Sequence, residues 1–140
     1  MATPNSENFL VFKSGAFNTT EEKDYFINPG CFGDDVARWL IAQLRASGCA
    51  AEPEAGQEDF GWYLTFEAAG IEHQAVIGYR PDSGDDQGEW ICWVERKAGL
   101  VGSLLGQRRN AKPEALEAIH RILSSSSLIS SVKRSSEEGI

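Results

Sequence analysis

Three cysteines and two histidines are the side chains of this sequence best suited to nucleophilic or metal chemistry. They are Cys31, Cys49, Cys92, His73 and His120. Cys31 lies just before a predicted helix, whose dipole can lower the pKa of a nearby thiol, but Asp34 and Asp35 would oppose a thiolate there. The five residues have neither zinc-site spacing nor the local signature of a cysteine enzyme. We therefore predict no catalytic pair and no metal site, with packed, reduced thiols and a partly buried, structural His120.

Two pairs of adjacent carboxylates, Asp34 with Asp35 and Glu58 with Asp59, could supply acid–base chemistry. Such chemistry needs one carboxyl of a pair to have a raised pKa, and no second feature near either pair provides it. The acidic segment 82–89 is only superficially like a calcium loop, because glycine and glutamine occupy its third and sixth positions. It is predicted to be a hairpin loop, and no cofactor is expected.

A basic patch at 96–112 combines five cations and three glycines without any acid. The cations are Arg96, Lys97, Arg108, Arg109 and Lys112. A glycine-rich backbone with cations can bind phosphate, but 99–106 lacks the Lys-Ser/Thr ending of a P-loop and the dinucleotide spacing. We interpret 97–112 as a solvated loop with one helical turn.

The segment 50–95 carries eleven acids and a single base, Arg80, and holds three of the four tryptophans. Its net charge of −10 exceeds that of the whole chain, which is −8. Tryptophan and tyrosine often anchor interfaces, and acidic rim charges speed association with a basic partner. A solvated acidic face with tryptophans in the core is the alternative interpretation.

Two amphipathic helices are predicted, at 34–47 and 113–124. Acids occupy the first turn of each, Gly48 ends the first helix, and Pro113 suits the start of the second. Each helix has one apolar stripe for the core. The stripes comprise Val36, Leu40 and Leu44 in the first helix and Leu116, Ile119, Ile122 and Leu123 in the second.

Strands are predicted where apolar residues alternate or β-branched and aromatic residues cluster. These runs are 9–13, 60–66, 73–80, 89–96 and 128–134. The middle three form an antiparallel meander with short connections, while 50–57 is predicted to be a loop. Trp90 and Trp93 are an odd number of positions apart, so they must lie on opposite faces of a regular strand. One of them therefore lies outside the main core.

The order β-α-β-β-β-α-β predicts an α+β two-layer sandwich, an antiparallel sheet of four to five strands with both helices on one face. We expect a single domain over 1–140, ordered over about 9–134. The other sheet face should present a semi-exposed aromatic and acidic surface. The residues predicted to bind a partner are Glu58, Asp59, Tyr63, Trp93 and Glu95.

Composition and charge narrow the classes of partner. A sequence pI near 4.7 argues against nucleic acid and anionic membranes, which need clustered cations. No apolar run approaches the ~20 residues of a membrane-spanning helix, and the polar N-terminus shows no secretory signal. We expect a cytoplasmic monomer or homodimer.

Four strings of the sequence are similar to those of a group of small bacterial α+β proteins with no assigned activity. They are YFINPGCFGDD at 25–35, QEDFGWY at 57–63, GYRP at 78–81 and WICWVER at 90–96. The resemblance extends over 9–132 and implies a bacterial, cytoplasmic origin. It implies no activity, cofactor or catalytic residue.

The function that these observations favour is a non-enzymatic acidic binding module, of immunity-protein or inhibitor type, which docks onto a basic protein. The alternative is a small enzyme or ligand-binding domain with its site between the 58–96 meander and the 97–112 loop. That site would use Glu58, Asp59, His73 or Arg96. A self-associating structural protein is a third possibility.

Overall fold

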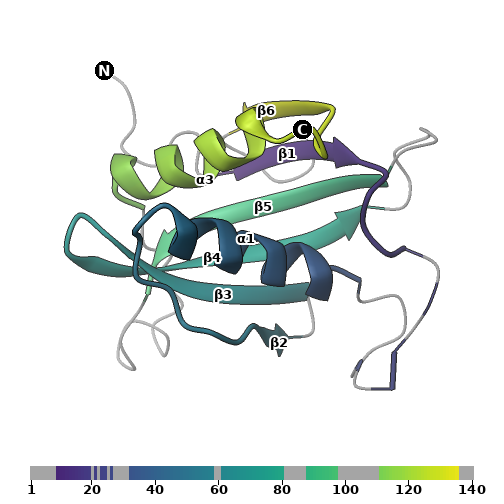
Figure 1. Ribbon diagram of the computed structural model, residues 1–140, viewed down its shortest axis with the longest axis horizontal. Helices are drawn as coiled ribbons and strands as arrows, with labels where there is room; N and C mark the ends of the chain where they lie inside the picture. Colours follow the sequence, from purple (N-terminus) through teal and green to yellow (C-terminus); the bar gives the residue numbers. More distant parts are fainter. Residues whose placement is uncertain are drawn as a thin grey trace.

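The protein folds into one six-stranded sheet with helices on one of its faces. The computed structural model describes residues 9–19, 21, 23, 24, 26, 32–58, 61–80, 88–97 and 111–135, without the side chains of Glu58 and Ser135. The elements are β1 (Phe9–Ser14), α1 (Asp34–Ala46), β2 (Gly56–Glu58), β3 (Gly61–Ala68), β4 (Ile71–Arg80), β5 (Gly88–Arg96), α3 (Pro113–Ser125) and β6 (Ser131–Ser135). The strands pair antiparallel in the order β2-β3-β4-β5-β1-β6, and α1 and α3 lie side by side in front of the sheet (Figure 1).

The predicted α+β sandwich is confirmed, but the sheet has six strands rather than four to five. The additional strand is β2, which lies within the segment predicted to be a loop. Its three residues pair with the start of β3, and Ala51 forms an isolated bridge with Phe66. A three-residue edge strand is held by backbone hydrogen bonds and is too short to show an alternation of apolar and polar residues. The sequence therefore contained no signal for β2.

Both predicted helical stripes pack against the sheet, and among their residues Ile122 alone is half-buried rather than buried. Within the described ranges, neither helix has the length and hydropathy needed to cross a lipid bilayer. The helical core residues are Val36, Leu40, Leu44, Leu116, Ile119 and Leu123, and the sheet opposes them with Leu10, Phe12, Trp62, Leu64, Phe66, Ile77, Trp90 and Cys92. A fully buried side chain of this kind contributes roughly 1.5–3 kcal/mol, so this layer is the main source of stability.

Trp90 and Trp93 lie on opposite sheet faces, as their spacing predicted. Trp90 is fully buried beneath the helices, where its ring stacks with that of Phe12. The ring centroids of Trp90 and Tyr79 are 4.9 Å apart. Phe17 packs edge-on against Trp90 from the segment that leads to α1. Trp90 is therefore the inward residue, and Trp93 faces away from the helices.

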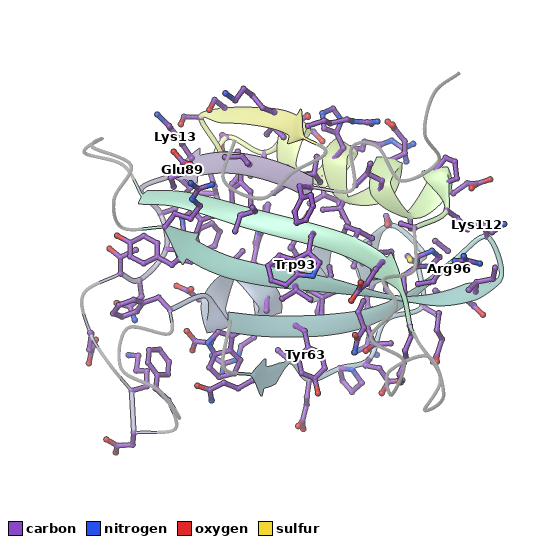
Figure 2. The ribbon with its side chains drawn as sticks, turned by 180° about the vertical axis from the view of Figure 1, so that it is seen from behind. Lys13, Tyr63, Glu89, Trp93, Arg96 and Lys112 are labelled. Atoms are coloured by element: carbon purple, nitrogen blue, oxygen red, sulfur yellow. The ribbon has the colours of Figure 1, made fainter. Side chains whose placement is uncertain are left out.

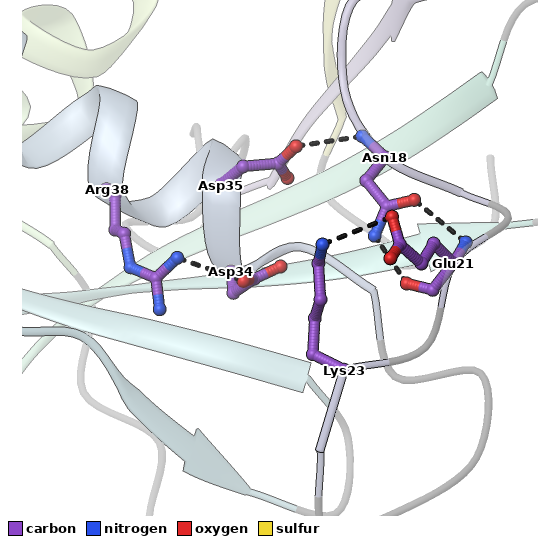
Figure 3. A network of polar contacts seen from close by, with 6 residues as sticks. All are labelled: Asn18, Glu21, Lys23, Asp34, Asp35 and Arg38. Atoms are coloured by element: carbon purple, nitrogen blue, oxygen red, sulfur yellow. Dashed lines mark hydrogen bonds and ion pairs between the residues drawn. The ribbon is translucent and has the colours of Figure 1, made fainter. Parts of the chain in front are cut away.

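The carboxylates at the start of α1 tie the preceding segment to the helix (Figure 3). Asp35 accepts a hydrogen bond from the backbone N–H of Asn18 at 2.8 Å, and Asp34 pairs with Arg38 at 3.0 Å. The Asn18 side chain in turn bonds the backbone of Glu21. Asp34 and Asp35 thus link the preceding segment and the first turn of α1.

The hairpin between β3 and β4 contains a strained alanine. Its two-residue turn is Ala69 and Gly70, with φ of 54° and 76°. Both angles are positive, and an L-residue with a Cβ pays roughly 1–2 kcal/mol for the left-handed region. Asparagine tolerates this region better than alanine.

We expect Ala69→Asn to raise the free energy of unfolding by about 0.5–1 kcal/mol, measured as a higher urea midpoint. Ala16→Asn is the matched control, because Ala16 is exposed at a bend and has no positive φ. Equal midpoints for the two variants would contradict the assignment of strain to Ala69.

Candidate interaction surface

Three of the residues predicted to bind a partner lie on one face of the sheet. Tyr63 is paired with Val76 across β3 and β4, and Val76 is paired with Trp93 across β4 and β5. Glu95 follows two positions along β5, on the same face. Figure 2 shows Tyr63 and Trp93 on the side of the sheet turned away from the helices. The structure therefore brings Tyr63, Trp93 and Glu95 together.

Other predicted residues are only partly placed by the structure. Glu58 ends β2 opposite Gly61, so its backbone lies at the edge of the sheet. The side chain of Glu58, the whole of Asp59 and Cys31, and the segments 81–87 and 98–110 lie outside the described residues. The predictions that depend on them stay predictions.

Tyr63, Trp93 and Glu95 are half-buried, in agreement with the expected semi-exposed surface, but another part of this outer face is apolar and buried. Phe9, Val11 and Ile91 are only 3%, 5% and 2% exposed, and Trp93 packs against them. The Phe9 and Trp93 ring centroids are 6.1 Å apart. The sequence analysis did not predict this apolar part, which forms because β1 lies beside β5 and its run of four apolar residues faces both layers.

Charged side chains lie at both ends of the sheet, and Arg96 shares the helix-covered face with Trp90 and Val94. Figure 2 shows Lys13 and Glu89 at one end and Arg96 with Lys112 at the other. Glu89 forms an ion pair with Arg80 at 3.7 Å. Part of the acidic charge of 50–95 is therefore neutralised within the sheet.

Three of the described glutamates gather near the β3–β4 hairpin. Glu67 and Glu72 are directly opposite each other and both are exposed, while the backbone N–H of Glu52 bonds the Thr65 carbonyl at 2.9 Å. Glu52, Glu67 and Glu72 line a groove of about 200 Å³, and we call these three residues the acidic edge. Lys97 lies 3.8 Å from Glu72 and offsets one charge.

Like charges directly opposite on neighbouring strands are destabilising, by an amount comparable to the roughly 0.2–1 kcal/mol of favourable pairs. Packing does not require this arrangement, because both glutamates are exposed. The acidic edge was missed in the sequence, although one signal was available. A two-residue turn at 69–70 makes positions 67 and 72 symmetric about the hairpin.

His73 is a buried structural residue. It is 0% exposed and stacks on Phe66, its Nδ1 donates a hydrogen bond to the Ile71 carbonyl at 3.0 Å, and its Nε2 accepts the Lys112 N–H at 3.1 Å. Burial lowers the pKa of His73, and the nearby cations Arg96 and Lys112 lower it further, against the opposing effect of the Ile71 carbonyl. Both ring nitrogens are committed to backbone groups, so His73 is not available for the proton transfer considered in the alternative function.

The described thiols are unreactive. Burial raises the pKa of Cys92 to about 12, and burial also raises the pKa of Cys49, whose thiol contacts the Glu67 carbonyl at 3.0 Å. Both thiols therefore stay protonated near neutral pH, in agreement with their predicted packing role. Within the described ranges, no cluster of three histidine, cysteine, aspartate or glutamate side chains could hold a metal ion.

The comparisons with known proteins leave the function to be argued from these residues. No family model, curated protein or solved structure matches the chain. The similarity to small bacterial proteins therefore stays a prediction, and it brings no activity with it.

Proposed function

We propose that this protein is a non-enzymatic binding module that docks onto a basic protein, in the manner of an immunity protein or another inhibitor. The observation that carries the proposal is the pair of exposed glutamates, Glu67 and Glu72, held directly opposite each other. A cation supplied by a partner would relieve the part of their repulsion that Lys97, 3.8 Å from Glu72, leaves in the free protein.

The sequence-predicted residues extend this acidic edge toward the middle of the outer face. Glu95 is paired with Gln74, and Gln74 with Thr65, in the row between Trp93 and the Glu67–Glu72 pair. Half-buried Tyr63 and Trp93 would then be apolar anchors beside an acidic rim. Such rim charges mainly raise the association rate and make it depend on salt.

The net negative charge of the whole chain also favours binding of a basic protein. A net charge of −8 creates a field that attracts basic proteins and repels nucleic acids. An inhibitor that covers a basic active surface needs this property and no catalytic group of its own. The proposed function thus requires that the described residues bind a partner, and it requires no catalytic group among them.

Glu67→Gln should weaken binding of a basic partner by about 3- to 10-fold at low salt, and the difference should shrink as salt screens the charges. The partner is first captured on the immobilised protein, identified and purified, and its affinity is then measured by calorimetry. The same substitution should leave the free energy of unfolding unchanged or raise it by up to ~1 kcal/mol, because it relieves the repulsion with Glu72.

Glu114→Gln is the matched control, since it removes the same charge from an exposed residue in the first turn of α3. It should leave the affinity nearly unchanged. Equal weakening by both variants would show that net charge alone attracts the partner, and failure to capture any basic protein would refute the proposed function.

A further inference from the structure

A groove between the two helices has the size and lining of a small-molecule site. It encloses about 570 Å³, within the roughly 300–1,000 Å³ usual for ligand pockets. It is lined by Trp39, Gln43, Ala46 and Ser47 from α1 and its end, and by Arg121, Ile122, Ser125, Ser126 and Ser127 from α3 and its end. The helices cover the sheet face opposite to Trp93, so this groove is separate from the outer-face docking surface (Figure 1).

Both helices contribute apolar surface to the groove. Trp39 and Ile122 are half-buried and pack against the main core. The Trp39 ring is steadied by Phe17, whose ring centroid lies 5.6 Å away. A rigid indole opposite a branched aliphatic side chain suits a flat apolar body.

Arg121 brings an uncompensated charge to this lining. Its expected ion-pair partner is Glu117, one helical turn earlier, but the Glu117 carboxylate instead accepts a hydrogen bond from Arg134 at 2.7 Å. Across the described part of the chain, the Arg121 guanidinium forms no ion pair. Among the described residues that line the groove, Arg121 is the one that carries a charge.

Further hydrogen-bond donors in the groove are unused. Neither the indole N–H of Trp39 nor the side-chain amide of Gln43 forms a hydrogen bond with any residue that the structure describes. The Ser126 hydroxyl oxygen accepts the Leu128 N–H at 3.1 Å, which leaves its own proton to donate. The Ser47 and Ser125 hydroxyls already donate to helix carbonyls. The guanidinium and the remaining donors of the lining suit a ligand that presents acceptors and negative charge.

We propose that this groove binds a small organic carboxylate with a flat apolar body. The carboxylate pairs with Arg121, and the body lies against Trp39 and Ile122. A carboxylate is favoured over a phosphate because a single guanidinium matches one negative charge in bidentate geometry. In addition, α1 and α3 both contribute their C-terminal turns, whose carbonyl dipoles disfavour a dianion more strongly than a singly charged carboxylate.

Titration of the full chain with indole-3-acetate tests the proposal, with two-dimensional NMR of the backbone and indole N–H groups as the readout. We expect saturable shifts of the Trp39 indole signal and of the Gln43 and Arg121 amides. Arg121→Gln should weaken binding at least about tenfold, the effect of losing a charge-assisted pair. Arg45→Gln, the matched control, removes the same charge from an exposed α1 residue outside the groove and should leave the affinity unchanged.

Indole-3-acetamide provides a comparison that needs no variant, since it keeps the apolar body and lacks the negative charge. It should bind at least about tenfold more weakly than the acetate. Equal affinities for acetate and amide, equal effects of Arg121→Gln and Arg45→Gln, or the absence of saturable shifts would each overturn the proposal. Tighter binding of phenyl phosphate than of benzoate would overturn the assignment to a carboxylate.

Discussion

Gly61→Ala is expected to cost more than about 3 kcal/mol of the free energy of unfolding, which is enough to unfold a marginally stable domain. A Cβ added to Gly61 would lie 2.0 Å from the carbonyl oxygen of Ile77 and 3.0 Å from its carbon. The φ of Gly61 is +150°, a conformation that alanine rarely adopts. The neighbouring backbone cannot withdraw freely, because Gly61 pairs with Glu58 and the adjoining Trp62 pairs with Ile77.

Chemical denaturation with circular dichroism measures this loss, and Gly15→Ala is the matched control. A Cβ at Gly15 would meet nothing within 4 Å, and its φ is not positive, so that variant should change stability by less than about 0.5 kcal/mol. Similar stabilities for the two variants would mean that β3 and β4 do not approach closely at Gly61.

Periodicity predicted the two helices and the main strands, because burial imposes it directly. The helices Asp34–Ala46 and Pro113–Ser125 agree to one residue with the predicted 34–47 and 113–124. The opposite orientation of Trp90 and Trp93 followed from strand geometry alone. These features depend on local spacing, which any single sequence contains.

Features that depend on which strands become neighbours could not be read in the same way. Phe9 and Val11 bury the outer face around Trp93 only because β1 lies beside β5, across a long stretch of sequence. The structural histidine was sought in α3, at His120, because that residue flanks an apolar stripe. His120 is half-buried, as expected, and His73 is a second, fully buried histidine, held by a hydrogen bond from Lys112, which is distant in sequence.

The candidate surface was predictable in part for the same reason. Alternation along β3 and β5 placed Tyr63, Trp93 and Glu95 on one face, whereas the acidic edge required the hairpin register and the pairing of Glu52 with β3. Local spacing determines which face a residue takes, and tertiary pairing determines what surrounds it.

The free energy of unfolding should decrease as the pH falls below about 6.5, the usual pKa of histidine, because of His73. Burial lowers the pKa of His73 in the folded protein, with Arg96 and Lys112 adding to the shift and Glu114 opposing it. Below the unfolded pKa, the unfolded chain binds a proton that the folded chain does not. The contribution of His73 is therefore complete above pH 6.5 or so and is lost as the pH falls toward the folded pKa, by at most about 1.4 kcal/mol per pH unit.

His73→Gln separates this titration from other acid effects. Glutamine cannot reproduce both the donor to Ile71 and the acceptor for Lys112, so the variant should lose about 1–3 kcal/mol at neutral pH. It should also lose the extra slope below pH 6.5, whereas His120→Gln, which removes the other histidine, should keep it. A slope that survives in His73→Gln would assign the acid sensitivity to carboxylates instead.

His73 directly follows Glu72 and joins the start of α3 to the sheet, so its protonation should loosen that junction. At acid pH the backbone N–H of Lys112 should then exchange with solvent faster than the backbone N–H groups in the core of β5.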